Sequence, residues 1–199
     1  MDAEKHLEMM KRQINAHLGK GKADGILRGI TAPPEDAPYE AVAQWAAALS
    51  ARLESEIPEA DLIPIREACA CIKANKYSVY NKKYFPEIRA QHPTDDEAYL
   101  QAVAAFLNGR GRIGKRVSYA DGRITASFGF GSSCVCTVIK GGWERPPSTI
   151  WCRCCQGTVK SLMQFVFPDR PCHIDIVETF ATGGADCVFT ASFGERVEN

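Results

Sequence analysis

The chain has 199 residues, of which 45% are hydrophobic and 24% are charged, and its formal net charge is +0. This length allows one large domain or a domain with a helical extension, and the apolar fraction supports a sizeable core. The balanced charge excludes an overall field that would attract nucleic acid or an anionic membrane, and no apolar run reaches the ~18 residues of a membrane helix.

The first half of the chain is predicted to be helical. Leu7, Met10, Ile14 and Leu18 recur at spacings of three and four, which places them on one helical face. Breakers rich in proline and glycine separate this helix from later ones. We expect helices over residues 2–18, from the proline-rich 32–38 segment through Leu53, from about Ile65 to Lys76, and from the capping box at Thr94 to Leu107.

The second half is predicted to contain the strands. A hairpin over residues 115–119 and 123–128 is indicated by the Asp121-Gly122 turn between two alternating segments. Further strands are expected at 137–139, from Ile174 to about Phe180 and at 188–193, and a helix is expected over 157–167. The chain is therefore predicted to be α+β, with a helical region over 1–109 and a cysteine-rich α/β region over 110–199 that packs with it as one unit.

Seven of the nine cysteines fall into three tight clusters. An odd number of cysteines does not favour a closed disulfide framework, and the charged amino terminus lacks the apolar segment of a signal peptide. We therefore expect a cytoplasmic protein with reduced thiols, in which clustered cysteines are ligands or redox groups. The clusters are Cys69-Ala70-Cys71, Cys134-Val135-Cys136 and Cys152-Arg153-Cys154-Cys155, and Cys172 and Cys187 stand alone.

The spacing of the later clusters indicates a metal site. Residues i and i+2 of an extended segment point to the same face, whereas on a helix they lie ~200° apart. Cys134 with Cys136 and Cys152 with Cys154 occur among strand and loop signals, so their four thiolates are expected to bind zinc, with Cys155 as a further ligand. An iron–sulfur cluster would use the same ligands and is the less favoured cofactor. Possible additional ligands are Cys69, Cys71, Cys172, His173, Glu178 and Cys187.

Two other interpretations of the cysteines remain open. Buried cysteines often act as small hydrophobic residues, and this reading is the better one for any single cysteine. A C-x-C pair can also cycle between dithiol and disulfide, which requires exposure and a lowered thiol pKa. The three clusters together favour the metal site over redox chemistry.

The segment from His173 to Phe189 carries the pattern E-T-aromatic-A-x-G-G-x-x-C-x-F. It resembles the last hairpin of the 4-vinyl reductase (hydrocarbon-binding) domains, and it is also similar to the tail of the L-2-amino-thiazoline-4-carboxylate hydrolase family. Uncharacterised cysteine-rich proteins of anaerobic bacteria have a like arrangement. The resemblance covers residues 130–193 and implies a bacterial protein.

The resemblance implies an antiparallel sheet with helices on one side, enclosing a small-molecule pocket. Sensor members of the family hold zinc through a glutamate and cysteines around this hairpin, and Glu178 and Cys187 match these positions. The position three residues after the glutamate is Ala181 here, so the C-x-C clusters would supply substitute ligands. The hydrolases carry a C-x-x-D segment, and the nearest counterpart is the run from Cys172 to Asp175.

A ligand pocket is expected near the cysteines. The basic residues Arg110, Arg112 and Arg116 suit an anionic group of a ligand, and Trp143 and Trp151 suit an apolar wall. The leading hypothesis is a small-molecule-binding protein with a thiolate metal site, without nucleic-acid or membrane partners; a homodimer is left open. One alternative is a hydrolase that cleaves C–N or C–S bonds of a small heterocycle, and another is a redox-active thiol protein.

Overall fold

The computed structural model describes residues 2–110, 116–127, 134, 136, 138, 139 and 148–196. The chain forms two compact units, each assembled from separate segments. Unit 1 comprises Met1–Cys71, Phe130–Gly157 and Thr179–Ala185, and unit 2 comprises Ile72–Gly129, Thr158–Glu178 and Asp186–Asn199. The units therefore do not divide at residue 109, because segments of the second half complete both of them.

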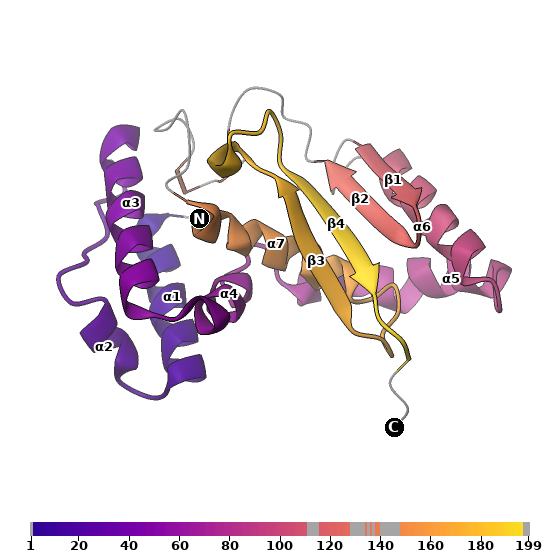
Figure 1. The fold of residues 1–199 in the computed structure, drawn as a ribbon, viewed down its shortest axis with the longest axis horizontal. Coiled ribbons are helices and arrows are strands. Elements are labelled where there is room, and N and C mark those ends of the chain that lie inside the picture. Colours follow the sequence, from indigo (N-terminus) through magenta and orange to yellow (C-terminus); the bar gives the residue numbers. More distant parts are fainter. Residues whose placement is uncertain are drawn as a thin grey trace. The chain divides into compact units, whose positions relative to one another are not determined.

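Unit 1 is built on amphipathic helices. The helices α1 (Ala3–Leu18), α2 (Lys22–Ile26), α3 (Tyr39–Glu56) and α4 (Glu59–Ala68) follow one another in the chain (Figure 1). Asp2 caps α1 by accepting a hydrogen bond from Lys5 N at 2.8 Å, and Gly19 ends the helix with a φ of 106°. The predicted apolar face of α1 is confirmed, since Leu7, Met10 and Ile14 are buried.

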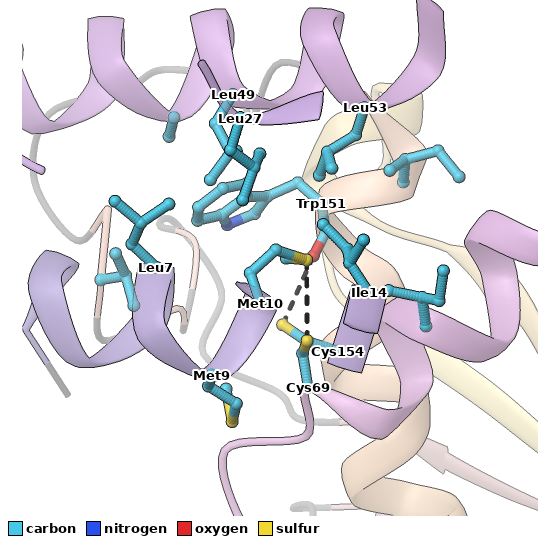
Figure 2. Packing of buried hydrophobic residues seen from close by; sticks show 14 of the residues in the cluster. Leu7, Met9, Met10, Ile14, Leu27, Leu49, Leu53, Cys69, Trp151 and Cys154 are labelled. Atoms are coloured by element: carbon cyan, nitrogen blue, oxygen red, sulfur yellow. Dashed lines mark hydrogen bonds between the residues drawn. The ribbon is translucent and has the colours of Figure 1, made fainter. Parts of the chain in front are cut away.

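The core of unit 1 also receives residues from the second half of the chain. The amino-terminal part of α7 (Thr149–Met163) contributes Ile150, Trp151 and Cys154, and the short segment near residue 138 contributes Cys136, Val138 and Ile139. Figure 2 shows Trp151 from α7 packed between the helices, with Leu27, Leu49 and Leu53 above it and Met10 below. A short 3-10 helix, η3 (Phe180–Thr182), also belongs to unit 1.

Unit 2 contains a four-stranded antiparallel sheet of order β1-β2-β4-β3. Its strands are β1 (Arg116–Ala120), β2 (Arg123–Ser127), β3 (Cys172–Glu178) and β4 (Val188–Phe193), as Figure 1 shows. The first hairpin turns at Asp121 and Gly122, whose φ angles of 49° and 73° suit a primed turn. Both predicted hairpins are confirmed, although β3 ends at Glu178.

Helical segments complete unit 2. They are η1 (Ala74–Tyr77), η2 (Tyr80–Tyr84), α5 (Phe85–Gln91), α6 (Asp96–Arg110) and the later part of α7. The helix α6 packs on β1 and β2. Aromatic rings fill the helical side, where Tyr80 meets Tyr77, Tyr84, Phe85 and Phe106 at centroid distances of 5.5–6.3 Å. The α+β class is thus confirmed.

Several predicted boundaries were wrong. The helix expected over 157–167 begins at Thr149, and the helix expected from Ile65 to Lys76 is α4, which ends at Ala68. Of the strand expected at 137–139, the described residues Val138 and Ile139 form a turn instead. Proline at position 64 did not mark the start of α4, because this residue lies inside the helix.

Candidate functional site

The candidate site is a group of cysteines in unit 1. Cys69 follows the last residue of α4, where its backbone N–H bonds to Arg66 O at 3.0 Å, and Cys71 lies two residues further on. Cys152, Cys154 and Cys155 lie on α7. The end of α4 and the start of α7 thus position most of the cysteines that the sequence singles out.

Gly157 allows these two elements to approach closely. A Cβ atom at this position would lie 2.0 Å from the carbonyl oxygen of Glu67 and 2.8 Å from its Cα. Only glycine fits such a backbone contact without displacing one of the two segments. This single residue therefore permits the close packing of α4 against the first turns of α7.

Cys154 is the centre of the group. Its side chain is buried, and hydrogen bonds from the Cys155 and Cys71 thiols hold its pKa well below the ordinary value, while Arg66 acts in the same direction. The pKa values of Cys71 and Cys155 are raised because each donates to this sulfur. Cys154 is therefore the most acidic thiol of this group.

Cys136 joins the same group from the 134–139 segment. Its side chain is buried, and Trp151 Nε1 donates a hydrogen bond to its Sγ at 3.4 Å. Burial and the negative charge of Cys154 raise its pKa. We call Cys71, Cys136, Cys154 and Cys155 the thiol cluster.

Arg66 is a fully buried cation next to the thiol cluster. Its guanidinium donates to Ile150 O at 3.1 Å and to Trp151 O at 2.8 Å, and it lies 5.0 Å from the Trp151 ring centroid. Within the described part of the chain Arg66 forms no salt bridge with a carboxylate. Deprotonation of Cys154 would place an anion beside this buried charge, and the Arg66 charge in turn lowers the pKa of the Cys154 thiol.

His6 completes the polar environment. Its Nε2 lies 3.1 Å from Arg66 Nη1, and because arginine can only donate, the imidazole accepts here and carries its proton on Nδ1. Burial, followed by the Arg66 charge, lowers the pKa of His6 to about 4. The imidazole is thus neutral at pH 7 and does not compete with Arg66 for the thiolate.

Cys154 Sγ also lies 3.4 Å from Trp151 O, at the distance of a hydrogen bond donated by a thiol. That carbonyl already accepts a shorter bond from Arg66 Nη2. In this arrangement the Cys154 thiol donates to Trp151 O while its sulfur accepts from the neighbouring thiols. If Cys154 loses its proton, Trp151 O keeps the bond from Arg66.

The structure brings together only part of the predicted ligand set. All five expected zinc ligands lie in unit 1, together with Cys69 and Cys71, but α7 is helical and the predicted extended Cys152-x-Cys154 pair was wrong. On a helix these two side chains point to different sides, and it is Cys155, three residues after Cys152, that shares its electrostatic environment. Cys134 is half-buried against the core of unit 1.

The remaining candidate residues lie elsewhere. Cys172, His173 and Glu178 lie on β3 of unit 2, and Cys187 precedes β4, so these residues belong to the other unit. Arg110 stacks on the Tyr84 ring at 4.0 Å, Arg116 lies 3.6 Å from Asp186, and Trp151 is buried in the core of unit 1. Arg112 and Trp143 lie outside the described residues.

Sequence reasoning missed Arg66 and His6 as neighbours of the cysteines. A signal was present for Arg66, because it shares a helical face with Leu62 and Cys69 at spacings of four and three. A signal was also present for His6, which lies four residues before Met10 on the apolar face of α1. A charged or polar residue on the apolar face of a predicted helix therefore indicates a polar side chain that is buried in the core.

The described residues contain no group of three or more histidine, cysteine, aspartate or glutamate side chains already arranged to hold a metal ion. A groove of about 710 Å³ lies beside α1, away from the thiol cluster, and is lined by α1 and residues 30–35. No described helix is both long enough and apolar enough to cross a bilayer.

A family model described as "Family of unknown function (DUF6144)" matches residues 2–197. No curated protein and no solved structure matches the chain. The resemblance to the 4-vinyl reductase domains therefore stays a prediction. The function has to be argued from the residues of unit 1.

Proposed function

We propose that this chain, which belongs to the DUF6144 family, is a metal-thiolate protein that binds one zinc ion through the thiol cluster. The observation that carries the proposal is the buried sulfur of Cys154, which accepts hydrogen bonds from the thiols of Cys71 and Cys155. Four sulfurs at about 2.3 Å from one zinc ion lie about 3.8 Å from one another, close to the length of a thiol hydrogen bond.

The donor set fits zinc in type and number. Cys71, Cys136, Cys154 and Cys155 come from the end of α4, from the 134–139 segment and from α7, and structural zinc sites are closed by four such thiolates. A zinc ion with four thiolates carries a net charge of −2, and the buried guanidinium of Arg66 offsets half of it. The role of the buried Arg66 in this proposal is to offset part of the negative charge of the zinc site.

Metal binding in this proposal is coupled to proton release. Cys154 is already the acidic member, whereas the thiols of Cys71, Cys136 and Cys155 have raised pKa values and must lose their protons to become ligands. Binding of zinc at pH 7 should therefore release about three protons and should weaken steeply as the pH falls.

The test is the zinc content of the protein purified without oxygen, measured by mass spectrometry with a count of reactive thiols. We expect about one zinc per chain, lost in Cys154→Ser and retained in Cys187→Ser. Cys187 is a matched control because it is an equally buried cysteine of unit 2. Unchanged zinc content in Cys154→Ser, or a metal-free wild-type protein with freely reactive thiols, would contradict the proposal.

A second candidate function is thiol–disulfide exchange by Cys154 and Cys71. A thiolate beside a protonated thiol is the reactive arrangement of a dithiol, and the hydrogen bond between these residues favours this chemistry. Because Cys154 is buried and Cys71 is only half-buried, unit 1 would have to open locally before Cys154 attacks a small-molecule disulfide and releases one thiolate. Cys71, after losing its proton, would displace the second thiolate and leave a Cys71–Cys154 disulfide. Reversible loss of these two thiols on treatment with a disulfide, without bound metal, would favour this candidate.

A further inference from the structure

Met10 places a thioether beside the cysteines of unit 1. Its Sδ lies 3.8 Å from Cys69 Sγ, and both side chains are fully buried. In Figure 2 the dashed line from Cys69 Sγ ends at Met10 Sδ, and the line from Cys154 Sγ ends at the carbonyl oxygen of Trp151, while Met9 of the same helix points away. Arg66 donates both to Met10 Sδ and to this carbonyl, and the three side chains belong to the same apolar core. Three sulfur donors from α1, the end of α4 and α7 therefore lie in one part of the core.

The distance between Met10 Sδ and Cys69 Sγ is the distance expected between two sulfur ligands of the same metal ion. Two sulfurs at about 2.3 Å from a metal, with a tetrahedral angle between them, are about 3.8 Å apart. Met10 and Cys69 already have this spacing. No backbone movement is needed for both to reach the same ion.

The chemistry of the donors selects the ion. A thioether is a neutral, soft ligand, and thioether with thiolate favours Cu(I) among the common metals. Cu(II) favours a tetragonal site with nitrogen and oxygen ligands, which this sulfur set does not offer. The dry surroundings of Met10, Cys69 and Cys154 also favour a low total charge.

Charge balance distinguishes Cu(I) from zinc at these three sulfurs. Arg66 Nη1 lies 4.0 Å from Met10 Sδ, so its charge belongs to the same buried region. Cu(I) with the thiolates of Cys69 and Cys154 has a charge of −1, which Arg66 neutralises. A zinc ion with the same ligands and Arg66 would leave a buried charge of +1, which is costly in an apolar core.

We propose that Met10, Cys69 and Cys154 form a Cu(I) site. The site rests on the proposed metal-thiolate function but uses a different ion and two different ligands. Because Cys154 belongs to both ligand sets, Cu(I) and zinc exclude each other. Binding of Cu(I) therefore releases zinc from the thiol cluster.

The test is an anaerobic titration of the full-length protein with Cu(I), in competition with a chromophoric Cu(I) chelator. We expect Met10→Leu to weaken Cu(I) binding by at least about tenfold, since leucine keeps the volume and removes the ligand. Met9→Leu is the matched control, a neighbouring buried methionine of α1, and should bind Cu(I) like the wild type. Zinc content should be unchanged in both variants.

Cys69→Ser gives an independent test because Cys69 is not in the proposed zinc set. It should lose Cu(I) affinity and retain zinc. Equal Cu(I) affinity of Met10→Leu, Met9→Leu and wild type would overturn the Cu(I) site, since binding would then be a general property of the thiols. Failure of the wild-type protein to bind either ion would instead overturn the metal-thiolate function itself.

Discussion

The two units differ in the charges that they bury. Unit 2 buries the carboxylate of Asp186, which accepts a hydrogen bond from Ser127 and lies 3.6 Å from Arg116. Unit 2 places its strongest ion pairs at or near the surface, where Asp96 binds Arg89 at 2.7 Å and Arg170 at 2.6 Å. Unit 1 instead buries Arg66 and His6 completely, among sulfur atoms and aromatic rings. Both units have apolar cores, so this difference is not needed for folding.

A buried charge normally costs free energy unless a partner and hydrogen bonds compensate for it. In unit 1 the compensation would come from Cys154, whose thiol pKa is held low by the neighbouring thiols and by Arg66, and a thiolate is a reactive and metal-binding group. We therefore propose that unit 1, rather than unit 2, carries the chemistry of this protein.

Replacement of Arg66 by methionine should have the largest effect. It leaves the carbonyl groups of Ile150 and Trp151 without their donor and the Cys154 thiolate without its cation, so we expect a loss of about 3–5 kcal/mol in the free energy of unfolding. Urea denaturation measures this loss. The control is Arg52→Met, whose side chain makes only long contacts with Ile26 O and Arg28 O at 3.4 and 3.5 Å, and which should cost less than about 1 kcal/mol.

Equal stability of Arg66→Met and wild type would show that the buried charge is not compensated by the thiolate. A loss no larger than that of Arg52→Met would have the same meaning. Either result would remove the main difference between the two units.

Protonation of His6 should make unit 1 sensitive to acid. Its pKa is about 4 in the folded protein and 6.5 in the reference state, so between these values the unfolded chain binds the proton and the folded chain does not. Stability therefore falls as the pH decreases from 6.5 to about 4, by about 3 kcal/mol in total. Unfolding free energies measured at intervals across this range check the slope.

His6→Gln is the variant for this test because it removes the titration but keeps a polar side chain of similar length. Its stability should depend less on pH between 6.5 and 4 than that of the wild type. His17→Gln, at the end of α1, should retain the wild-type slope. Parallel slopes for all three proteins would contradict a neutral, buried His6.

Gly157→Ala tests the packing that assembles the thiol cluster. The new methyl group would meet the backbone of Glu67, which cannot rotate away, so we expect a loss of about 2–3 kcal/mol and impaired metal binding. Gly109→Ala in α6 is the matched control, because nothing lies within 4 Å of its added Cβ and alanine favours the helix. A Gly157→Ala protein with unchanged stability and metal content would show that the approach of α4 to α7 is not required.

The sequence predicted the parts of the fold that depend on local patterns. The hairpin at Asp121-Gly122 and the apolar face of α1 followed from turn chemistry and periodicity, and both are confirmed. The start of α7 was missed because Cys152 to Cys155 were interpreted as extended ligands. Trp151, Cys154 and Thr158 follow one another at spacings of three and four, and this pattern fits an apolar helical face equally well.

The candidate site was predicted only in part, because long-range packing brings it together. Local spacing cannot show that the Cys69-x-Cys71 segment lies beside α7, since this contact depends on Gly157 and Glu67, which are 90 residues apart. The division into units is likewise non-local, with residues 130–157 joining the first 71. The sequence singled out the cysteines, but only the fold shows that Cys71 lies in the same group as Cys154 and Cys155.

The smallest expected effect concerns the ion pairs of unit 2. Asp96 is partly exposed, and hydrogen bonds from Arg170 and Arg89 lower the pKa of its carboxyl group although burial opposes this. Because solvent screens such pairs, Asp96→Asn should lower the free energy of unfolding by only about 1 kcal/mol and leave metal content unchanged. Glu97→Gln is the control, since it removes a neighbouring first-turn charge of α6 without an arginine contact. A loss as large as that of Arg66→Met would mean that unit 2 also depends on a critical charge, and the contrast between the units would fail.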